Sequence, residues 1–251
     1  MKARVPDLSL LVLRKRHCTI TVTLQCNFAF DVDGTLTPSR QRIAPSFEEW
    51  FLSFCQTNNV YLVSGSDYEK TLEQLGEEIC NTVKGVYSCC GNALYVSGEL
   101  QYVNDFSLTT EQHEYLESLL QLSSFSKRTG NHIEMRPGSC NFSVIGRNAN
   151  MNERSEYLEY DTRVDERNFY AFLIRETFPM LEATVAGETG IDIHPVGKDK
   201  SQVAEYISPF VFFGDKIYPG GNDYTIAQHA IKQYNVSTWE ETFEILKKEY
   251  S

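Results

Sequence analysis

The chain has 251 residues, of which 41% are hydrophobic and 23% charged, and its formal net charge is −11. This length is enough to bury a sizeable core, as one large domain or as a core with a smaller inserted domain. Its apolar runs are shorter than the roughly 18 residues of a membrane-spanning helix, and its acidic balance argues against general binding of nucleic acids or anionic membranes.

The first 25 residues differ in character from the rest. A short apolar run at 8–13 lies between basic residues. It is shorter than the ~7–15 residues of a signal-peptide core, and no small-residue cleavage site follows it. We expect residues 1–25 to form an extension outside the fold, with organelle targeting left open as an alternative.

The seven cysteines have irregular spacings, with neither a CxxC pair nor a Cys/His metal-binding spacing. This usage is typical of reduced thiols and favours a cytoplasmic location over a disulfide framework.

The segment from residue 27 to residue 89 alternates strand and helix patterns. Apolar runs predict strands, and aromatic residues at helical spacing predict helices. Such alternation indicates a parallel sheet with crossover helices, and ligands bind such sheets at the carboxyl ends of the strands. The predicted strands are 27–30, 59–67 with its terminal turn, and 84–89, and the predicted helices are 46–57 and 67–80.

From about residue 95 the pattern changes to strands separated by turn signals, with one long polar helix at about 150–177. It predicts an antiparallel sheet with helices, inserted into the parallel fold, before a strand at 209–215 and a final helix at 237–250 restore the first pattern. The inserted strands are expected at 131–136, 140–147, 181–187 and 190–196. We therefore expect a core of 26–95 plus 191–251 and a cap of 96–190.

Two aspartates, Asp31 and Asp33, follow the first strand in the string DVDGT. Residues two apart on a strand point the same way, so these carboxylates would repel each other unless a cation lies between them. Mg²⁺ suits such hard oxygen ligands. One carboxylate could attack phosphorus while the other handles a proton, with Gly34 admitting phosphate to the backbone and Thr35 orienting the loop. The alternative is a surface turn with helix-capping acids.

Further polar residues follow other predicted strands. Ser64 or Ser66 supplies a hydroxyl after the second strand, and Lys198 or Lys200 could neutralise phosphate before a late helix. Acidic and amide side chains also follow the strand at 209–215, namely Asp215, Asn222 and Asp223. Acids at both ends of the core favour a folded Mg²⁺ site over a surface turn.

These motifs resemble those of the haloacid dehalogenase (HAD) phosphotransferase superfamily, over about residues 28–251. The resemblance is closest to the eukaryotic-type α-phosphomannomutases, whose long strings DVDGTLTPxRQ, GSDxEKxxEQLG, IExRxGxxNxSxIGR and FFGDKxxPGGND all occur here. It implies an α/β fold, with a Rossmann-like HAD core and an inserted α+β cap of type C2 carrying an antiparallel sheet.

The resemblance also implies roles in the core. Asp31 would be the nucleophile and Asp33 the acid/base, and Lys200 would contact the transferring phosphate. Asp215 would bind Mg²⁺ together with Asp31 and the backbone carbonyl of Asp33. Asn222 and Asp223 would complete the surroundings of the metal.

The stretch 127–154 holds five basic and two acidic residues in an otherwise acidic chain. Arginine forks there could hold the far phosphate of a bisphosphorylated sugar, although a solvated cap face would show the same charges. By resemblance, one set of residues would bind phosphate or sugar, namely Arg40, Arg128, Arg136, Asn141, Arg147, Arg154 and Asp192.

Three positions depart from the family pattern. Ser64 stands where the mutases read Gly, Gly190 replaces a serine near Asp192, and Cys89-Cys90 replace Glu-Asn before Gly91. The extra hydroxyl at Ser64 is typical of the phosphatases of the superfamily, and the other two changes affect the sugar contact and the connection to the cap.

The primary hypothesis is a Mg²⁺-dependent phosphomannomutase that interconverts mannose 6-phosphate and mannose 1-phosphate, with hexose 1,6-bisphosphate as activator. A sugar-phosphate phosphatase on the same site is the first alternative, and a catalytically silent interaction protein is the second. The resemblance further suggests a homodimer formed through the cap.

Overall fold

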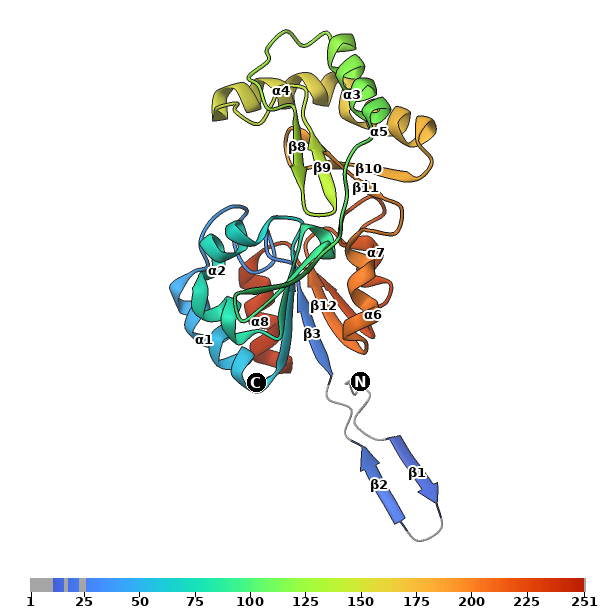
Figure 1. Ribbon diagram of the computed structural model, residues 1–251. Coiled ribbons are helices and arrows are strands. Elements are labelled where there is room, and N and C mark those ends of the chain that lie inside the picture. The colour runs from blue at the N-terminus through green and yellow to red at the C-terminus, as the bar shows by residue number, and fades with distance from the viewer. Residues whose placement is uncertain (1–10, 16–17, 23–25, 251) are drawn as a thin grey trace.

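The computed structural model describes residues 11–15, 18–22 and 26–250. Two larger sheets organise the chain: a seven-stranded sheet in the core and a four-stranded antiparallel sheet in the cap (Figure 1). Within the predicted N-terminal extension, β1 (Leu11–Lys15) pairs with β2 (Cys18–Val22) in a separate antiparallel sheet, and the other positions of the extension lie outside the described residues. None of the described helices has the length and apolar character that crossing a bilayer requires.

The core sheet has the order β13-β12-β3-β4-β5-β6-β7. Its first five members pair in parallel, and the last two add an antiparallel hairpin. The central strands are near-continuous apolar runs because helices cover both faces. The strands are β3 (Asn27–Phe30), β4 (Asn59–Val63), β5 (Gly85–Ser88), β6 (Ala93–Val96), β7 (Glu99–Val103), β12 (Phe210–Gly214) and β13 (Lys232–Asn235).

Side-chain alternation along β3 separates two apolar clusters. Phe28 and Phe30 join the cluster beneath the longer helices, whereas Ala29 packs on the opposite face. The first cluster holds α1 (Pro45–Thr57), α2 (Tyr68–Thr82) and α8 (Trp239–Glu249), and the second holds η2 (Lys200–Val203), α6 (Ala204–Ile207) and α7 (Tyr224–Ala227).

The cap sheet has the order β10-β11-β9-β8, and helices pack against one of its faces (Figure 1). Two of these helices begin with a capping box, formed by Thr109 with Gln112 and by Asn150 with Glu153. The elements are α3 (Thr110–Leu122), β8 (Ile133–Arg136), β9 (Ser139–Phe142), α4 (Met151–Val164), α5 (Glu166–Thr177), β10 (Leu181–Ala186) and β11 (Gly190–Pro195).

The prediction of one helix over 150–177 was wrong. Asp165 adopts a left-handed backbone conformation (φ 58°), which ends α4 and starts α5. The break is fixed by buried Asp161, whose carboxylate accepts hydrogen bonds from the backbone N–H and the Nε of Arg167, both at 2.8 Å. The polar periodicity of the sequence continues through this corner and therefore did not reveal it.

The sheets also suggest domain boundaries other than the expected ones. β7 belongs to the core sheet and ends at Val103, while β11 belongs to the cap sheet and ends at Pro195. We propose that the core spans 26–103 and 196–250 and that the cap spans 104–195.

The aromatic cluster beneath α1 generates a stability prediction. Phe51 is fully buried, and its ring centroid lies 5.3 Å from that of Phe30 in an edge-on arrangement. Replacing it in Phe51→Ala should lower the free energy of unfolding by about 3–5 kcal/mol, because a cavity remains. Urea denaturation measures this, and Phe169→Ala, at a helical phenylalanine that is 55% exposed, should change stability by no more than about 0.5 kcal/mol. Equal losses would contradict the assignment of the core.

Candidate active site

Three aspartates from separate parts of the chain meet at the carboxyl edge of the core sheet. Asp31 follows β3 and Asp215 follows β12, and these two strands are adjacent and parallel. Asp223 precedes α7. One carboxylate oxygen from each of the three lies within 4.8 Å of the others. The structure thus brings together three of the predicted acids, from both ends of the core.

Lys200 is the cation among these acids. Its side chain is fully buried, with Nζ 2.5 Å from Oδ1 of Asp31 and 2.7 Å from Oδ1 of Asp223. A buried ammonium without partners would be costly, so both ion pairs are needed to keep this lysine inside. Of the two lysines that the sequence offered, the structure brings Lys200 to the aspartates.

Burial and mutual charge shift the pKa values of this cluster. Burial, opposed by Lys200 and reinforced by Asp223 and Asp215, raises the pKa of Asp31 to about 7. Burial also raises the pKa of Asp215. For Lys200 burial acts the other way, but Asp223 and Asp31 outweigh it and raise its pKa. Burial is therefore the main cause of the raised pKa of Asp31, and the neighbouring carboxylates of Asp223 and Asp215 add to it against the pull of Lys200.

The residues present fit a divalent cation. Oδ1 of Asp215 is buried and has no hydrogen-bond partner. Gly34 has φ 84°, and a Cβ there would come within 2.6 Å of Oδ2 of Asp215, so only glycine lets the loop approach this carboxylate so closely. Three carboxylates with an unused buried oxygen are a donor set that suits a hard cation. Asn222, also predicted as a ligand, is exposed, and its Nδ2 lies near Gly65.

Asp33 does not join this triad. Its Oδ1 accepts hydrogen bonds from the backbone N–H of Arg40 at 2.7 Å and from Nε2 of Gln74 at 3.0 Å. Its Oδ2 lies 3.5 Å from the hydroxyl of Ser66. The predicted residues Arg40 and Ser66 thus meet Asp33, whereas sequence reasoning missed Gln74. In the sequence, Gln74 stands out only as part of the EQLG string that resembles the family.

Two of the predicted hydroxyl residues are fully buried near the carboxyl ends of β3 and β4. Thr35 is fully buried, and its Oγ1 donates to Oδ2 of Asp31 at 3.4 Å. Ser64 is also fully buried at the end of β4, where its Oγ accepts a hydrogen bond from the backbone N–H of Ser66 at 3.0 Å. Its own hydroxyl proton is thereby free to point elsewhere.

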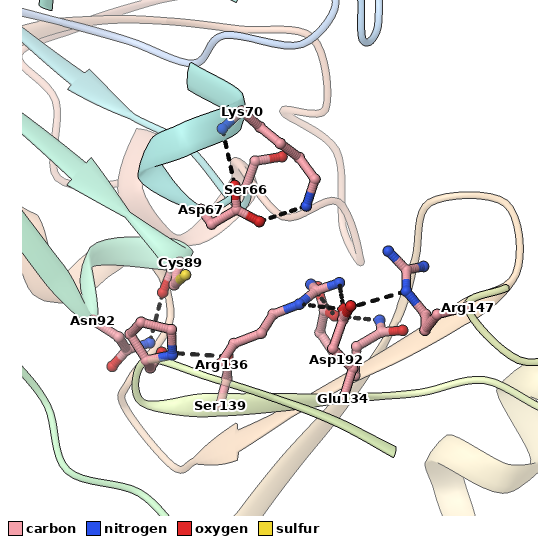
Figure 2. Close-up of polar contacts among 12 residues, drawn as sticks. Ser66, Asp67, Lys70, Cys89, Asn92, Glu134, Arg136, Ser139, Arg147 and Asp192 are labelled. Carbon is pink, nitrogen blue, oxygen red and sulfur yellow. Dashed lines mark hydrogen bonds and ion pairs between the residues drawn. The ribbon is translucent and has the colours of Figure 1, made fainter. Parts of the chain in front are cut away.

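On the cap strands two carboxylates organise the predicted arginines (Figure 2). Arg136 pairs with Glu134 at 2.5 Å and with Asp192 at 3.4 Å. Nε of Arg147 lies 3.2 Å from the same oxygen of Glu134, in a charge contact without hydrogen-bond geometry. Asn141 donates to Asp192 at 2.6 Å. The prediction did not include Glu134, which holds two of its arginines together.

Core and cap cations line one cavity between the domains. It measures about 220 Å³ and includes Arg40 from the core and Arg147 from the cap. Burial lowers the pKa of Arg147, and the positive charges of Arg136, Arg154 and Arg40 lower it further against the pull of Glu134. Such crowded cations favour an anion. The lining residues are Arg40, Gln41, Arg42, Ser66, Lys70, Glu73, Gln74 and Arg147.

Two other predicted arginines are engaged elsewhere. Arg154 is buried and contacts Glu188 with both Nε and a terminal nitrogen at 3.2 Å. Arg128 donates to backbone carbonyls at the end of α3, among them that of Leu120 at 2.9 Å. Neither lines the cavity between the domains, so their predicted phosphate contacts stay predictions.

Gly190, one of the departures from the family pattern, lies directly against the side chain of Asn141. A Cβ at this position would lie 2.5 Å from Nδ2 of Asn141 and 2.8 Å from its Oδ1. The carboxamide of Asn141 therefore occupies the space beside Gly190 that a serine side chain would need. Oδ1 of Asn141 is buried without a hydrogen-bond partner.

Another departure, Cys89-Cys90, lies in the core between β5 and β6. Asn92, fully buried just after it, donates to the carbonyl of Cys89 at 2.8 Å and to that of Lys198 at 2.9 Å. Its Oδ1 accepts from Asn104 at 2.9 Å. Gly138 in the β8–β9 turn packs on it, since a Cβ there would lie 2.4 Å away. One amide thus ties together both connections to the cap, and sequence reasoning gave no indication of it.

Comparison with known proteins identifies the family of this chain. The sequence model of the eukaryotic phosphomannomutase family matches residues 47–251. The chain belongs to this family. A phosphomannomutase of Dendrobium officinale is 35% identical over 212 residues, covering 78% of this chain and 82% of the relative. Phosphomannomutase 2 of Dictyostelium discoideum is 32% identical over 214 residues, covering 80% and 86%.

Solved structures show the same fold at low sequence identity. The C-terminal domain of a trehalose-6-phosphate phosphatase from C. albicans superposes with a TM-score of 0.55 at 16% identity, over 90% of this chain and 77% of the other. A haloacid dehalogenase-like hydrolase from Bacteroides thetaiotaomicron gives 0.53 at 14% identity, over 87% and 91%. The predicted HAD fold, an α/β core with an inserted antiparallel sheet, is confirmed.

The aspartate triad generates a prediction about metal binding. Asp215→Asn should weaken Mg²⁺ binding at least about tenfold, since it removes a charged ligand. Asp33→Asn is the matched control, because the family resemblance gives that residue only a backbone contact, and the affinity should be unchanged. Calorimetric titration with Mg²⁺ measures both. Equal weakening in the two variants, or an unchanged Mg²⁺ affinity in Asp215→Asn, would contradict the assignment.

The amide that joins the domains generates a second prediction. Asn92→Ala should lower the free energy of unfolding by about 1–3 kcal/mol, because buried carbonyls lose their donor. Asn168, an exposed asparagine whose one side-chain hydrogen bond is to Asp165, provides the control, since Asn168→Ala should change stability by no more than about 0.5 kcal/mol. Urea unfolding measures both, and an unchanged Asn92→Ala would show that the connections hold without it.

Proposed function

We propose that this protein is a Mg²⁺-dependent phosphomannomutase that interconverts mannose 6-phosphate and mannose 1-phosphate through a phosphorylated Asp31 and a hexose bisphosphate. The observation that carries the proposal is the cavity shared by Arg40 of the core and Arg147 of the cap. A phosphatase needs to hold one phosphate, whereas a mutase must also hold the second phosphate while the sugar turns. Guanidinium groups suit that second contact.

In the proposed reaction an oxygen of Asp31 attacks phosphorus and the bond from phosphorus to the leaving sugar oxygen breaks. Asp33 supplies the proton that this oxygen needs, and in the return step it removes the proton of the attacking hydroxyl. Lys200, in contact with Asp31 at 2.5 Å, would stabilise the negative charge of the transferring group. Asp31, Asp215 and Asp223 would hold Mg²⁺, which when bound offsets the charge of phosphate and carboxylates.

One observation favours a sugar-phosphate phosphatase as the second candidate. Ser64 presents a hydroxyl at the end of β4, beside the loop that carries Ser66. The phosphatases of the superfamily carry a hydroxyl at this position, where the mutases read glycine. In that case water, in place of a sugar hydroxyl, would attack the phosphorylated Asp31.

One assay separates the two candidates. Purified protein receives mannose 1-phosphate, Mg²⁺ and a trace of hexose 1,6-bisphosphate, and both mannose 6-phosphate and free phosphate are measured. The proposal predicts isomer in large excess over free phosphate, because water is excluded once the cap is closed. Free phosphate without isomer would contradict the mutase proposal and support the phosphatase. Neither product would support a silent protein.

Variants test the roles of individual residues in the same assay. Asp31→Asn should abolish both products, since it removes the nucleophile. Arg147→Gln should reduce isomer formation by about 100-fold or more, which corresponds to losing a charged hydrogen bond of roughly 3 kcal/mol. It should spare hydrolysis of a small phosphate ester that has no second phosphate. An equal fall in both reactions would refute the contact with the second phosphate.

A further inference from the structure

The carboxylate of Asp33 is held unevenly. Oδ1 accepts two hydrogen bonds, from the backbone N–H of Arg40 at 2.7 Å and from Nε2 of Gln74 at 3.0 Å. Oδ2 has a single contact, with the hydroxyl of Ser66 at 3.5 Å. Arg40 has φ 58°, so it adopts a left-handed conformation while its N–H donates to Asp33. Oδ1 is thus occupied by the protein, and Oδ2 is the oxygen left for a substrate.

Gln74 is itself fixed by its surroundings. It is only 5% exposed in α2, and its Nε2 also donates to Oγ1 of Thr37 at 2.9 Å. Both hydrogens of the amide are therefore used, one on Asp33 and one on buried Thr37. Turning the amide over would set its oxygen against the Asp33 carboxylate, so the donor orientation is the favourable one.

Gln74 also lies in the wall of the cavity. It lines the 220 Å³ cavity together with Arg40 and Arg147, and its backbone carbonyl accepts the N–H of Ile43 at 2.9 Å. The side chain that holds Asp33 thus belongs to the wall of the cavity between the two domains.

We propose that Gln74 is a positioning residue for acid/base catalysis: by occupying Oδ1 of Asp33, it directs Oδ2 toward the sugar oxygen that leaves or attacks phosphorus. The proposal rests on the proposed function, because it takes Asp33 as the acid/base. Gln74 would not touch the substrate's reacting atoms. It would fix the rotation of the carboxylate that does, and catalysis is sensitive to such alignment.

The leaving group separates this role from a merely structural one. A sugar alkoxide is a poor leaving group and needs a proton from Asp33, whereas nitrophenolate departs without one. Damage to the positioning of Asp33 should therefore slow transfer from a hexose 1,6-bisphosphate and spare transfer from p-nitrophenyl phosphate. General loosening of the fold would slow both reactions alike.

The experiment uses the full chain with Mg²⁺ and follows the first turnover, namely transfer of phosphate to the protein. Rapid quenching with radiolabelled hexose 1,6-bisphosphate gives one rate, and the burst of nitrophenol gives the other. Gln74→Leu should lower the rate with the hexose bisphosphate about tenfold or more, which is part of the roughly 10²–10⁴-fold that general acid catalysis contributes, and leave the nitrophenol burst unchanged. Thr37→Val, which removes the other acceptor of the Gln74 amide, should show the same selectivity to a smaller degree.

Two controls complete the design. Gln112→Leu removes another buried helical glutamine, 6% exposed in α3 of the cap, and should leave the ratio of the two rates unchanged. Asp33→Asn should show the strongest selectivity. If Asp33→Asn is selective and Gln74→Leu slows both substrates equally or neither, the inference about Gln74 is overturned and the proposed function stands. If Asp33→Asn is not selective, or if hexose 1,6-bisphosphate does not phosphorylate the native chain, the proposed function itself fails.

Discussion

The structure depends on the pairing of Lys200 with Asp31 and Asp223. The lysine is fully buried, and it joins positions that are 169 residues apart in the chain. Removing one partner of a buried ion pair costs about 3–5 kcal/mol, because the other charge is left uncompensated. This contact fixes η2, which follows the second connection from the cap, against the strand that carries Asp31. The fold and the site are thus held by the same charges, and the three carboxylates leave negative charge that suits a divalent cation.

Both domains contribute residues to the candidate site. The core supplies the carboxylates and hydroxyls, and the cap supplies arginines held by Glu134 and Asp192. Of these cap arginines, Arg147 lines the cavity together with Arg40 of the core. Asn92 bonds both connections between the domains. The same amide donates to the carbonyl of Cys89, one of the two cysteines that replace the family's Glu-Asn pair.

Much of the core was predictable because its signals are local. Apolar runs that end in Asp31 and Asp215 predicted buried parallel strands, and parallel strands bring their carboxyl ends to one edge. Features that no local sequence pattern indicates were missed. The helix break at Asp165 depends on a buried contact between Asp161 and Arg167, and the hairpin of β6 and β7 was overlooked because the core was expected to end near residue 95. Gln74 was visible only as part of a family string, since nothing in the sequence says which carboxylate a helical glutamine will reach.

The sequence by itself determined the fold class and the strand-end aspartates, because strand periodicity and motif spacing act over a few residues, and it predicted phosphate transfer as their chemistry. Only the tertiary structure decided which lysine meets Asp31, which arginines face the cavity, and that Asn141 fills the space beside Gly190. These contacts join residues from distant elements, and their distances follow from how sheets and helices pack. The DVDGT string therefore did not predict the partners of its two acids, which are Lys200 for Asp31 and Gln74 for Asp33.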